Sequence, residues 1–341
     1  MRTQRRVVAL STILFLCAIL PSRSTFAADP SASDEAPSKF LRFVPDEHGG
    51  GTLQASTVRF VNADGVVVDL VAAIHIAEPS FFQALDESFA EYDAVLYELV
   101  APSEMLVPAT QGSSARVLRD PSASRPAGSR PTTRRRPQRS LAWVGGLQQG
   151  MKDALKLSFQ LEGIDYRRPN FIHADLDAET FQDLQQERGE SMFTIMLNAM
   201  LKEMSNPGAG AAGPGLGDIL FAMRSPDRAR SLKLLLARQF GKLDEQMAGL
   251  DGPNGSVILT ERNKACLKVL RQQLAEGDKR NLAIFYGAAH LKGIEQVMTK
   301  ELGFRQVGPP FWRVAWDMST PRGGATTKST TRQRGATVPV R

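Results

Sequence analysis

Two distant segments of this chain share one arrangement: an apolar run, small residues, a histidine, and the start of a helical pattern. One segment spans 69–76 and contains His75, and the other spans 282–291 and contains His290. The chain has only four histidines, so two of them in matching places constrain the fold. Short apolar runs followed by an amphipathic pattern indicate buried strands, with each histidine just beyond a strand's carboxyl end. Open α/β sheets bind their ligands at that edge.

The first histidine belongs to a pattern of strand, helix and strand. Residues 58–61 and 66–70 flank Asn62-Ala63-Asp64-Gly65, whose Asp-Gly pair favours a β-hairpin turn. Pro79 suits the first position of a helix, and residues 94–100 return as a strand. A right-handed crossover would make the strands on either side of this helix parallel neighbours in an α/β fold.

The rest of the chain continues in helical and α/β patterns. The expected elements are mostly helices over 141–250 with one short strand over 170–175, a helix over about 260–276, a strand over 281–286, a helix striped from Leu291 to Leu302, and a closing strand over 311–316. The second histidine, His290, therefore also stands between a strand and a helix.

Composition divides the chain into a folded body and flexible appendages. Arg2, Arg5 and Arg6 precede an apolar run that fits a secretory signal peptide. The expected regions are a signal peptide over 1–27, a flexible lead over 28–50, a domain over 51–318 interrupted by a disordered basic insertion over 101–140 and a helical insertion over 141–250, and a disordered tail over 319–341. We expect an exported protein, periplasmic or extracellular, unless an uncleaved amino terminus anchors it to the membrane.

The net charge of +6 misleads about partners, because the basic residues lie mainly outside the body. Residues 1–27 carry +4, residues 101–140 carry +6 and residues 319–341 carry +5, which leaves −9 for the rest. An acidic body with basic appendages is not typical of a specific nucleic-acid-binding protein. The insertion and the tail are expected to make at most weak contacts with anionic surfaces.

Cysteine content limits the covalent constraints on the mature protein. Cleavage of the signal peptide would leave Cys266 as the only cysteine, since Cys17 lies within the signal. No intramolecular disulfide could then form. Cys266 lies on the apolar stripe of the helix expected over 260–276, which favours a buried thiol over a nucleophile.

A catalytic centre at the two histidines needs carboxylates, since two imidazoles alone seldom hold a divalent ion. Glu98 lies in the otherwise apolar strand 94–100, where a charged side chain is costly unless it is paired or bound to metal. The alternative interpretation is that both histidines cap helices or fill polar pockets, and that Glu98 is a strand-end glutamate in water.

A polar triplet, Glu261-Arg262-Asn263, opens the helix that precedes the second histidine. The guanidinium of Arg262 could orient a carboxylate or stabilise developing negative charge. The alternative is that Glu261 only favours the helix dipole and that Asn263 lies at the surface. His173 and Asp175 form a third polar pair that could reach the same site.

These residues resemble the TraB/PrgY/GumN family, which includes the Tiki-type metal-dependent proteases. The family pattern has two Gly-x-x-His motifs, a glutamate that ends the strand after the first motif, and a Glu-Arg-Asn or similar triplet before the second. Here the second motif is Gly287-Ala288-Ala289-His290, the glutamate is Glu98 and the triplet is Glu261-Arg262-Asn263. The first motif departs from the pattern, because Ala72 stands where a glycine is expected.

The resemblance covers about residues 52–100 and 141–318, in order. It implies a fold related to erythromycin-esterase-like and haem-binding ChaN-like proteins. That fold is α/β (α+β), with a mixed central sheet, flanking helices and a helical insertion over the crevice at the carboxyl ends of the strands. A resemblance of this kind carries fold better than function.

The leading hypothesis is an exported metal-dependent hydrolase that acts on peptide or ester bonds and takes a peptide or small molecule as its partner. The roles would be metal ligation (Mn, Co or Zn) by His75, Glu98 and His290, general base catalysis by Glu261, and oxyanion stabilisation by Arg262 and Asn263. One alternative is a non-catalytic protein that sequesters a peptide or a haem-like ligand in the same crevice. Another is an envelope protein that works through its arginine-rich insertion.

Overall fold

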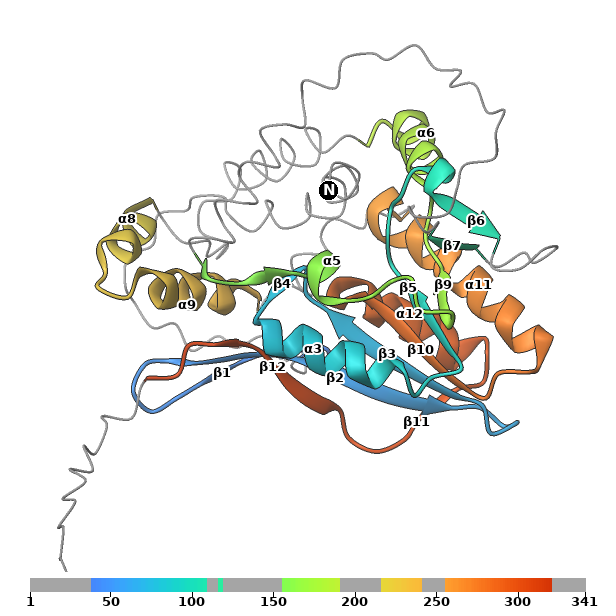
Figure 1. Cartoon of the computed structure of the whole chain (residues 1–341), viewed down its shortest axis with the longest axis horizontal. Helices are drawn as coiled ribbons and strands as arrows, with labels where there is room; N and C mark the ends of the chain where they lie inside the picture. Colours follow the sequence, from blue (N-terminus) through green and yellow to red (C-terminus); the bar gives the residue numbers. More distant parts are fainter. Residues whose placement is uncertain (1–37, 109–115, 119–154, 191–215, 241–254, 321–341) are drawn as a thin grey trace, which may run out of the picture.

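The computed structural model describes residues 38–108, 116–118, 155–190, 216–240 and 255–320. Within them the chain forms a mixed parallel and antiparallel sheet flanked by helices (Figure 1), which confirms the predicted α/β fold. The predicted signal peptide and nearly all of the predicted tail lie outside the described residues. No helix among the described residues is long and apolar enough to cross a membrane.

The central sheet has the strand order β1-β2-β3-β10-β5-β9-β7-β6, and β11 and β12 also pair with β2. Its strands are β1 (Leu41–Pro45), β2 (Gly51–Val61), β3 (Val67–Ala73), β5 (Ala94–Tyr97), β6 (Leu106–Pro108), β7 (Arg116–Leu118), β9 (Phe171–His173), β10 (Asn281–Gly287), β11 (Arg305–Gln306) and β12 (Phe311–Asp317). The four strands β3, β10, β5 and β9 run parallel to one another, and the other pairings are antiparallel. A second, two-stranded sheet pairs β4 (Ile76–Ala77) with β8 (Ser158–Phe159).

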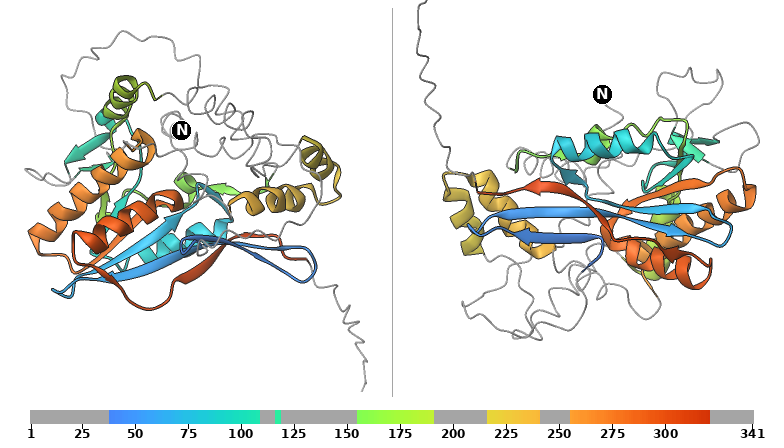
Figure 2. Two further views of the ribbon diagram at one scale, coloured as in Figure 1. Left: turned by 180° about the vertical axis from the view of Figure 1, so that it is seen from behind. Right: turned by 90° about the horizontal axis from the view of Figure 1, so that it is seen from below.

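Helices cover both faces of the parallel part of the sheet (Figure 2). The helical elements are α3 (Pro79–Phe89), η1 (Ser103–Met105), α5 (Gln160–Gly163), α6 (Ala178–Arg188), α8 (Leu216–Arg224), α9 (Arg228–Phe240), the π-helix η2 (Val257–Glu261), α11 (Arg262–Glu276) and α12 (Ala288–Lys300). On one face, Phe89 of α3 packs its ring 4.9 Å from that of Phe285 in β10. On the other face, α12 buries Leu291, Ile294 and Met298. Burial of these apolar stripes holds the parallel strands between two helical layers.

The prediction that the strands before and after α3 are neighbours is wrong, because β10 lies between β3 and β5. Residues 282–286 of β10 are all buried, as suits a central strand covered on both faces. The strand that follows α11 therefore completes the centre of the sheet. This insertion brings the second histidine segment between the first one and Glu98.

Three predicted regions contain strands that the sequence pattern did not indicate. The predicted lead over 28–50 contains β1, which pairs with the first half of β2 and follows the buried Phe40. The predicted insertion over 101–140 contains η1, β6 and β7, and β7 pairs with β9. Such short edge strands need little apolar sequence, because backbone hydrogen bonds to an existing sheet edge supply much of their order. The predicted helical region over 141–250 contains β8, which the pattern did not indicate. It also contains β9, which confirms the short strand predicted over 170–175.

Candidate functional site

Polar side chains follow the carboxyl ends of all four parallel strands. His75 comes two residues after β3, Glu98 directly follows β5, and Asp175 comes two residues after β9. His290 lies in the first turn of α12, directly after β10. Because adjacent parallel strands end at the same edge of a sheet, these side chains converge there, at the edge where α/β sheets bind ligands. The prediction that each of the two histidines lies just beyond a strand's carboxyl end is confirmed.

The carboxylate of Glu98 is buried at the centre of this edge, with only 4% of the residue exposed. Its Oε1 accepts a hydrogen bond from Arg262 Nη2 at 2.6 Å, and its Oε2 accepts one from the backbone N–H of Gly287. Burial alone would raise the pKa of Glu98, but Arg262, the two histidines and the Gly287 N–H lower it to about 2. Glu98 is therefore ionised at neutral pH.

The guanidinium of Arg262 bridges two carboxylates. Besides Glu98, it binds Asp175 through Nε at 2.9 Å and Nη2 at 2.6 Å, and only 2% of the residue is exposed. Burial would lower the pKa of Arg262, but Asp175 and Glu98 raise it above its ordinary value. Two carboxylates around one guanidinium leave one uncompensated negative charge at this edge. The contacts favour a positioning role for Arg262, since its Nε and Nη2 are already bound to carboxylates.

Asn263 fixes the ring of His290. Asn263 Nδ2 donates to the His290 carbonyl at 3.3 Å, so its Oδ1 faces the ring and accepts from Nδ1–H at 2.8 Å. Nε2 then carries the lone pair of the neutral imidazole. Burial, partly offset by Glu98, lowers the pKa of His290 to about 4. The ring is therefore neutral near pH 7, and Asn263 holds it in one tautomer.

The Nε2 atom of His290 is buried and has no hydrogen-bond partner among the described residues. It lies 3.7 Å from Glu98 Oε1, beyond hydrogen-bond distance. A buried polar atom without a partner is uncommon in folded proteins and costs free energy. It marks a place where the fold leaves a lone pair free beside a carboxylate.

His75 lies on the other side of the central strand and is half-buried. Its Nδ1 lies 3.3 Å from Gln160 Oε1. Burial lowers the pKa of His75, and the charge of Glu98 offsets part of that effect. The structure thus brings His75, Glu98, Arg262, Asn263 and His290 together at one edge of the sheet.

The carboxylate of Glu261 has other partners. It accepts from Lys264 Nζ at 3.0 Å and from Arg188 Nη2, and among the described residues it forms no hydrogen bond or ion pair with Glu98 or the two histidines. Burial would raise the pKa of Glu261, but Lys264 and Arg188 lower it below its ordinary value. Glu261 is therefore ionised, and its predicted role as a general base stays a prediction.

Two glycines make room for these contacts. A Cβ on Gly287 would lie 3.1 Å from Glu98 Oε2, and one on Gly293 would lie 2.7 Å from Asn263 Nδ2. The φ angle of Gly287, −50°, is open to any residue, so a larger residue there would be tight against Glu98 but not strained in its backbone. The sequence pattern does not reveal the role of Gly293, because a lone glycine within a helical pattern does not indicate which side chain lies against it.

Three other polar side chains have structural contacts. His173 is buried, and its Nε2 donates to the Leu99 carbonyl at 2.7 Å. Cys266 is fully buried, as predicted, and burial raises the pKa of its thiol. The hydroxyl of Tyr286 donates to the Ala174 carbonyl, and its ring lies 5.4 Å from that of His290. Of these three side chains, only Tyr286 is shown packed against His290.

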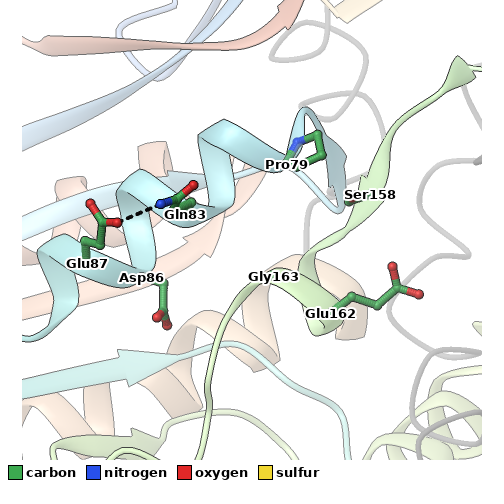
Figure 3. Close-up of a pocket in the computed structure, with 7 residues that line it drawn as sticks. All are labelled: Pro79, Gln83, Asp86, Glu87, Ser158, Glu162 and Gly163. Carbon is green, nitrogen blue, oxygen red and sulfur yellow. Dashed lines mark hydrogen bonds between the residues drawn. The ribbon is translucent and has the colours of Figure 1, made fainter.

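A pocket of about 320 Å³ lies between α3 and the β8–α5 segment (Figure 3). It is lined by Pro79, Gln83, Asp86, Glu87, Ser158, Glu162 and Gly163. No residue of the predicted site lines it. Within the described ranges, no group of three or more His, Cys, Asp or Glu side chains is already arranged as a metal site.

Comparison with family models, with curated proteins and with solved structures found no match to this chain. The resemblance to the TraB/PrgY/GumN family therefore stays a prediction from the motifs.

Proposed function

We propose that this protein binds one divalent metal ion through His75, Glu98 and His290 and is a metal-dependent hydrolase of peptide or ester bonds. The observation that carries the proposal is the buried, unpaired Nε2 of His290 beside the Glu98 carboxylate. A lone pair kept free at that cost is expected where a ligand completes the site.

The chemistry of the donors supports the same proposal. Two neutral imidazoles and one ionised carboxylate are in the protonation states that metal ligation requires, and nitrogen and oxygen donors suit Mn²⁺, Co²⁺ or Zn²⁺. The one uncompensated negative charge of Glu98, Asp175 and Arg262 would be neutralised in part by a cation. The chemical types of the three donors therefore suit such an ion, although the described residues do not already hold them in the arrangement of a formed metal site.

The supporting residues would keep the donors in place. A bound divalent ion would polarise a carbonyl group and lower the pKa of water. Arg262 and the Gly287 N–H hold the two oxygens of Glu98, and Asn263 holds His290 in one tautomer. Contacts of this kind around a ligand typically contribute about 10- to 100-fold in metal affinity or activity. The oxyanion role predicted for Arg262 and Asn263 is less favoured by these contacts than a positioning role.

The amino-terminal sequence supports export as part of the proposal. Arg2, Arg5 and Arg6 before an apolar run fit a signal peptide over 1–27, which would place the mature protein in the periplasm or outside the cell.

A second candidate is a protein that sequesters a peptide or a haem-like ligand without turnover. The contacts of Glu261 favour it, because Lys264 and Arg188 already bind the carboxylate that a hydrolase would use as a base. The variant Glu261→Gln distinguishes the two functions. It abolishes hydrolysis if Glu261 is the base, and it leaves ligand affinity unchanged if the protein only binds.

The test of the proposal is metal-dependent hydrolysis. The mature protein is dialysed against a chelator and assayed with a quenched fluorescent peptide library and with an ester, before and after Mn²⁺, Co²⁺ or Zn²⁺ is added. We expect activity only with metal, one ion bound per chain, and loss of both in His75→Ala and His290→Ala. The exposed His48 supplies the control, His48→Ala. Hydrolysis that survives exhaustive chelation, or in both histidine variants, would contradict the proposal.

Replacing Gly293 by alanine tests the support of His290. The added methyl group would push Asn263 away from the His290 ring, so we expect Co²⁺ affinity to fall by about 10-fold. Titration followed by the visible spectrum of bound Co²⁺ measures the change. Gln296→Ala, an exposed position on the same helix, is the control and should bind like the wild type. Equal Co²⁺ affinities in Gly293→Ala and Gln296→Ala would show that Asn263 does not support metal binding by His290.

A further inference from the structure

Gln160 holds His75 at two points. Its backbone N–H donates to the His75 carbonyl at 2.9 Å, and its side-chain Oε1 lies 3.3 Å from the His75 ring at Nδ1. Gln160 is the first residue of α5 and is buried. One residue therefore fixes both the main chain and the ring of the histidine that follows β3.

Tyr166 determines which end of the Gln160 amide faces the histidine. Gln160 Nε2 donates to the Tyr166 hydroxyl at 2.7 Å, and Tyr166 is itself buried. Oε1 is then the atom that faces Nδ1, and an acceptor there requires Nδ1 to carry the proton. The lone pair of His75 is therefore on Nε2.

The second histidine has the same kind of support from a different element. Asn263, in α11, also contacts both the main chain and the Nδ1 of its histidine, at 3.3 Å and 2.8 Å. Both amides have their nitrogen committed elsewhere, so both present an oxygen to Nδ1. Two unrelated segments thus select one tautomer in two rings that flank one carboxylate.

We propose that Gln160 is a positioning residue that sets the tautomer and the orientation of His75, with Nδ1 protonated and Nε2 free. The expected effect of Gln160 on metal binding rests on the proposed function. The tautomer of His75 does not depend on it. The sequence around Gln160 alternates apolar and polar residues and gives no indication of a site. Its role follows from the pairing of β4 with β8, which brings α5 against the residues after β3.

The test reads the tautomer directly in the metal-free protein. The ¹⁵N shifts of the His75 ring, assigned with His75→Ala, distinguish Nδ1–H from Nε2–H. We expect Nδ1–H in the wild type, a mixture of both tautomers in Gln160→Met, and Nδ1–H restored in Gln160→Glu, which keeps an acceptor oxygen. Tyr166→Phe, which keeps Gln160 but frees its amide to turn, should also give a mixture. Gln83→Met, at an exposed glutamine on α3, is the control and should match the wild type.

Co²⁺ titration of the same variants separates this inference from the proposed function. We expect Gln160→Met to weaken Co²⁺ binding by about 10- to 100-fold and Gln160→Glu to restore most of it. A tautomer change in Gln160→Met without Co²⁺ binding in any variant would support the positioning role and contradict the metal site. An unchanged His75 tautomer in both Gln160→Met and Tyr166→Phe would overturn the positioning role, whatever Co²⁺ does.

Discussion

Replacing Arg262 by alanine is expected to lower the free energy of unfolding by about 3–5 kcal/mol, because it leaves Glu98 and Asp175 buried without their shared partner. Removal of one partner costs far more than the intact bridge contributes, since the remaining charges stay desolvated. Urea denaturation of the metal-free protein measures the effect without any contribution from a bound ion.

Two further variants separate the buried bridge from ordinary surface pairing. Arg271, on the same helix, pairs with the exposed Glu301, and Arg271→Ala is expected to cost less than about 1 kcal/mol. Arg262→Lys keeps the charge but cannot span both carboxylates as the planar guanidinium does, so an intermediate loss is expected. If Arg262→Ala lowered the free energy of unfolding no more than Arg271→Ala does, the variant would not contain two buried, charged carboxylates without a partner. That result would contradict the prediction.

Much of the fold was predictable because its signals are local. The Asp-Gly turn before β3, the proline that begins α3 and the apolar runs of β3 and β10 each depend on a few adjacent residues. The position of β10 between β3 and β5 is different in kind. The apolar pattern of β3 and β5 is the same whether the two strands are adjacent or have β10 between them. The sequence pattern therefore cannot distinguish these two strand orders.

The candidate site was predictable only in part, for a related reason. His75, His290 and Glu98 stand out as polar residues at the ends of apolar runs, and such positions converge in a parallel sheet. Arg262 stands out as well, but its double contact with Asp175 and Glu98 is a tertiary feature. Gln160 carries no local signal, because it begins the short helix α5 and reaches His75 only through the pairing of β8 with β4.

Replacing Glu98 by glutamine is expected to weaken binding of Co²⁺ by more than about 100-fold. Loss of a residue that only supports a metal-binding side chain typically costs at most about 100-fold. The substitution removes the one proposed ligand that carries a charge and keeps the shape of the side chain. It also brings an amide N–H against either Arg262 or the Gly287 N–H, since both Glu98 oxygens accept hydrogen bonds. A loss of stability of about 1–3 kcal/mol should therefore accompany the loss of metal.

That stability loss makes a folding control necessary. Glu87, an exposed glutamate that accepts from Gln83, supplies Glu87→Gln, which should bind Co²⁺ like the wild type. Gly287→Ala gives a second route to the same carboxylate, because its Cβ would crowd Glu98 Oε2 without changing any charge. If Glu98→Gln folds and binds Co²⁺ with wild-type affinity, Glu98 is no ligand. The free Nε2 of His290 would then have to bind something other than a metal ion held jointly with Glu98.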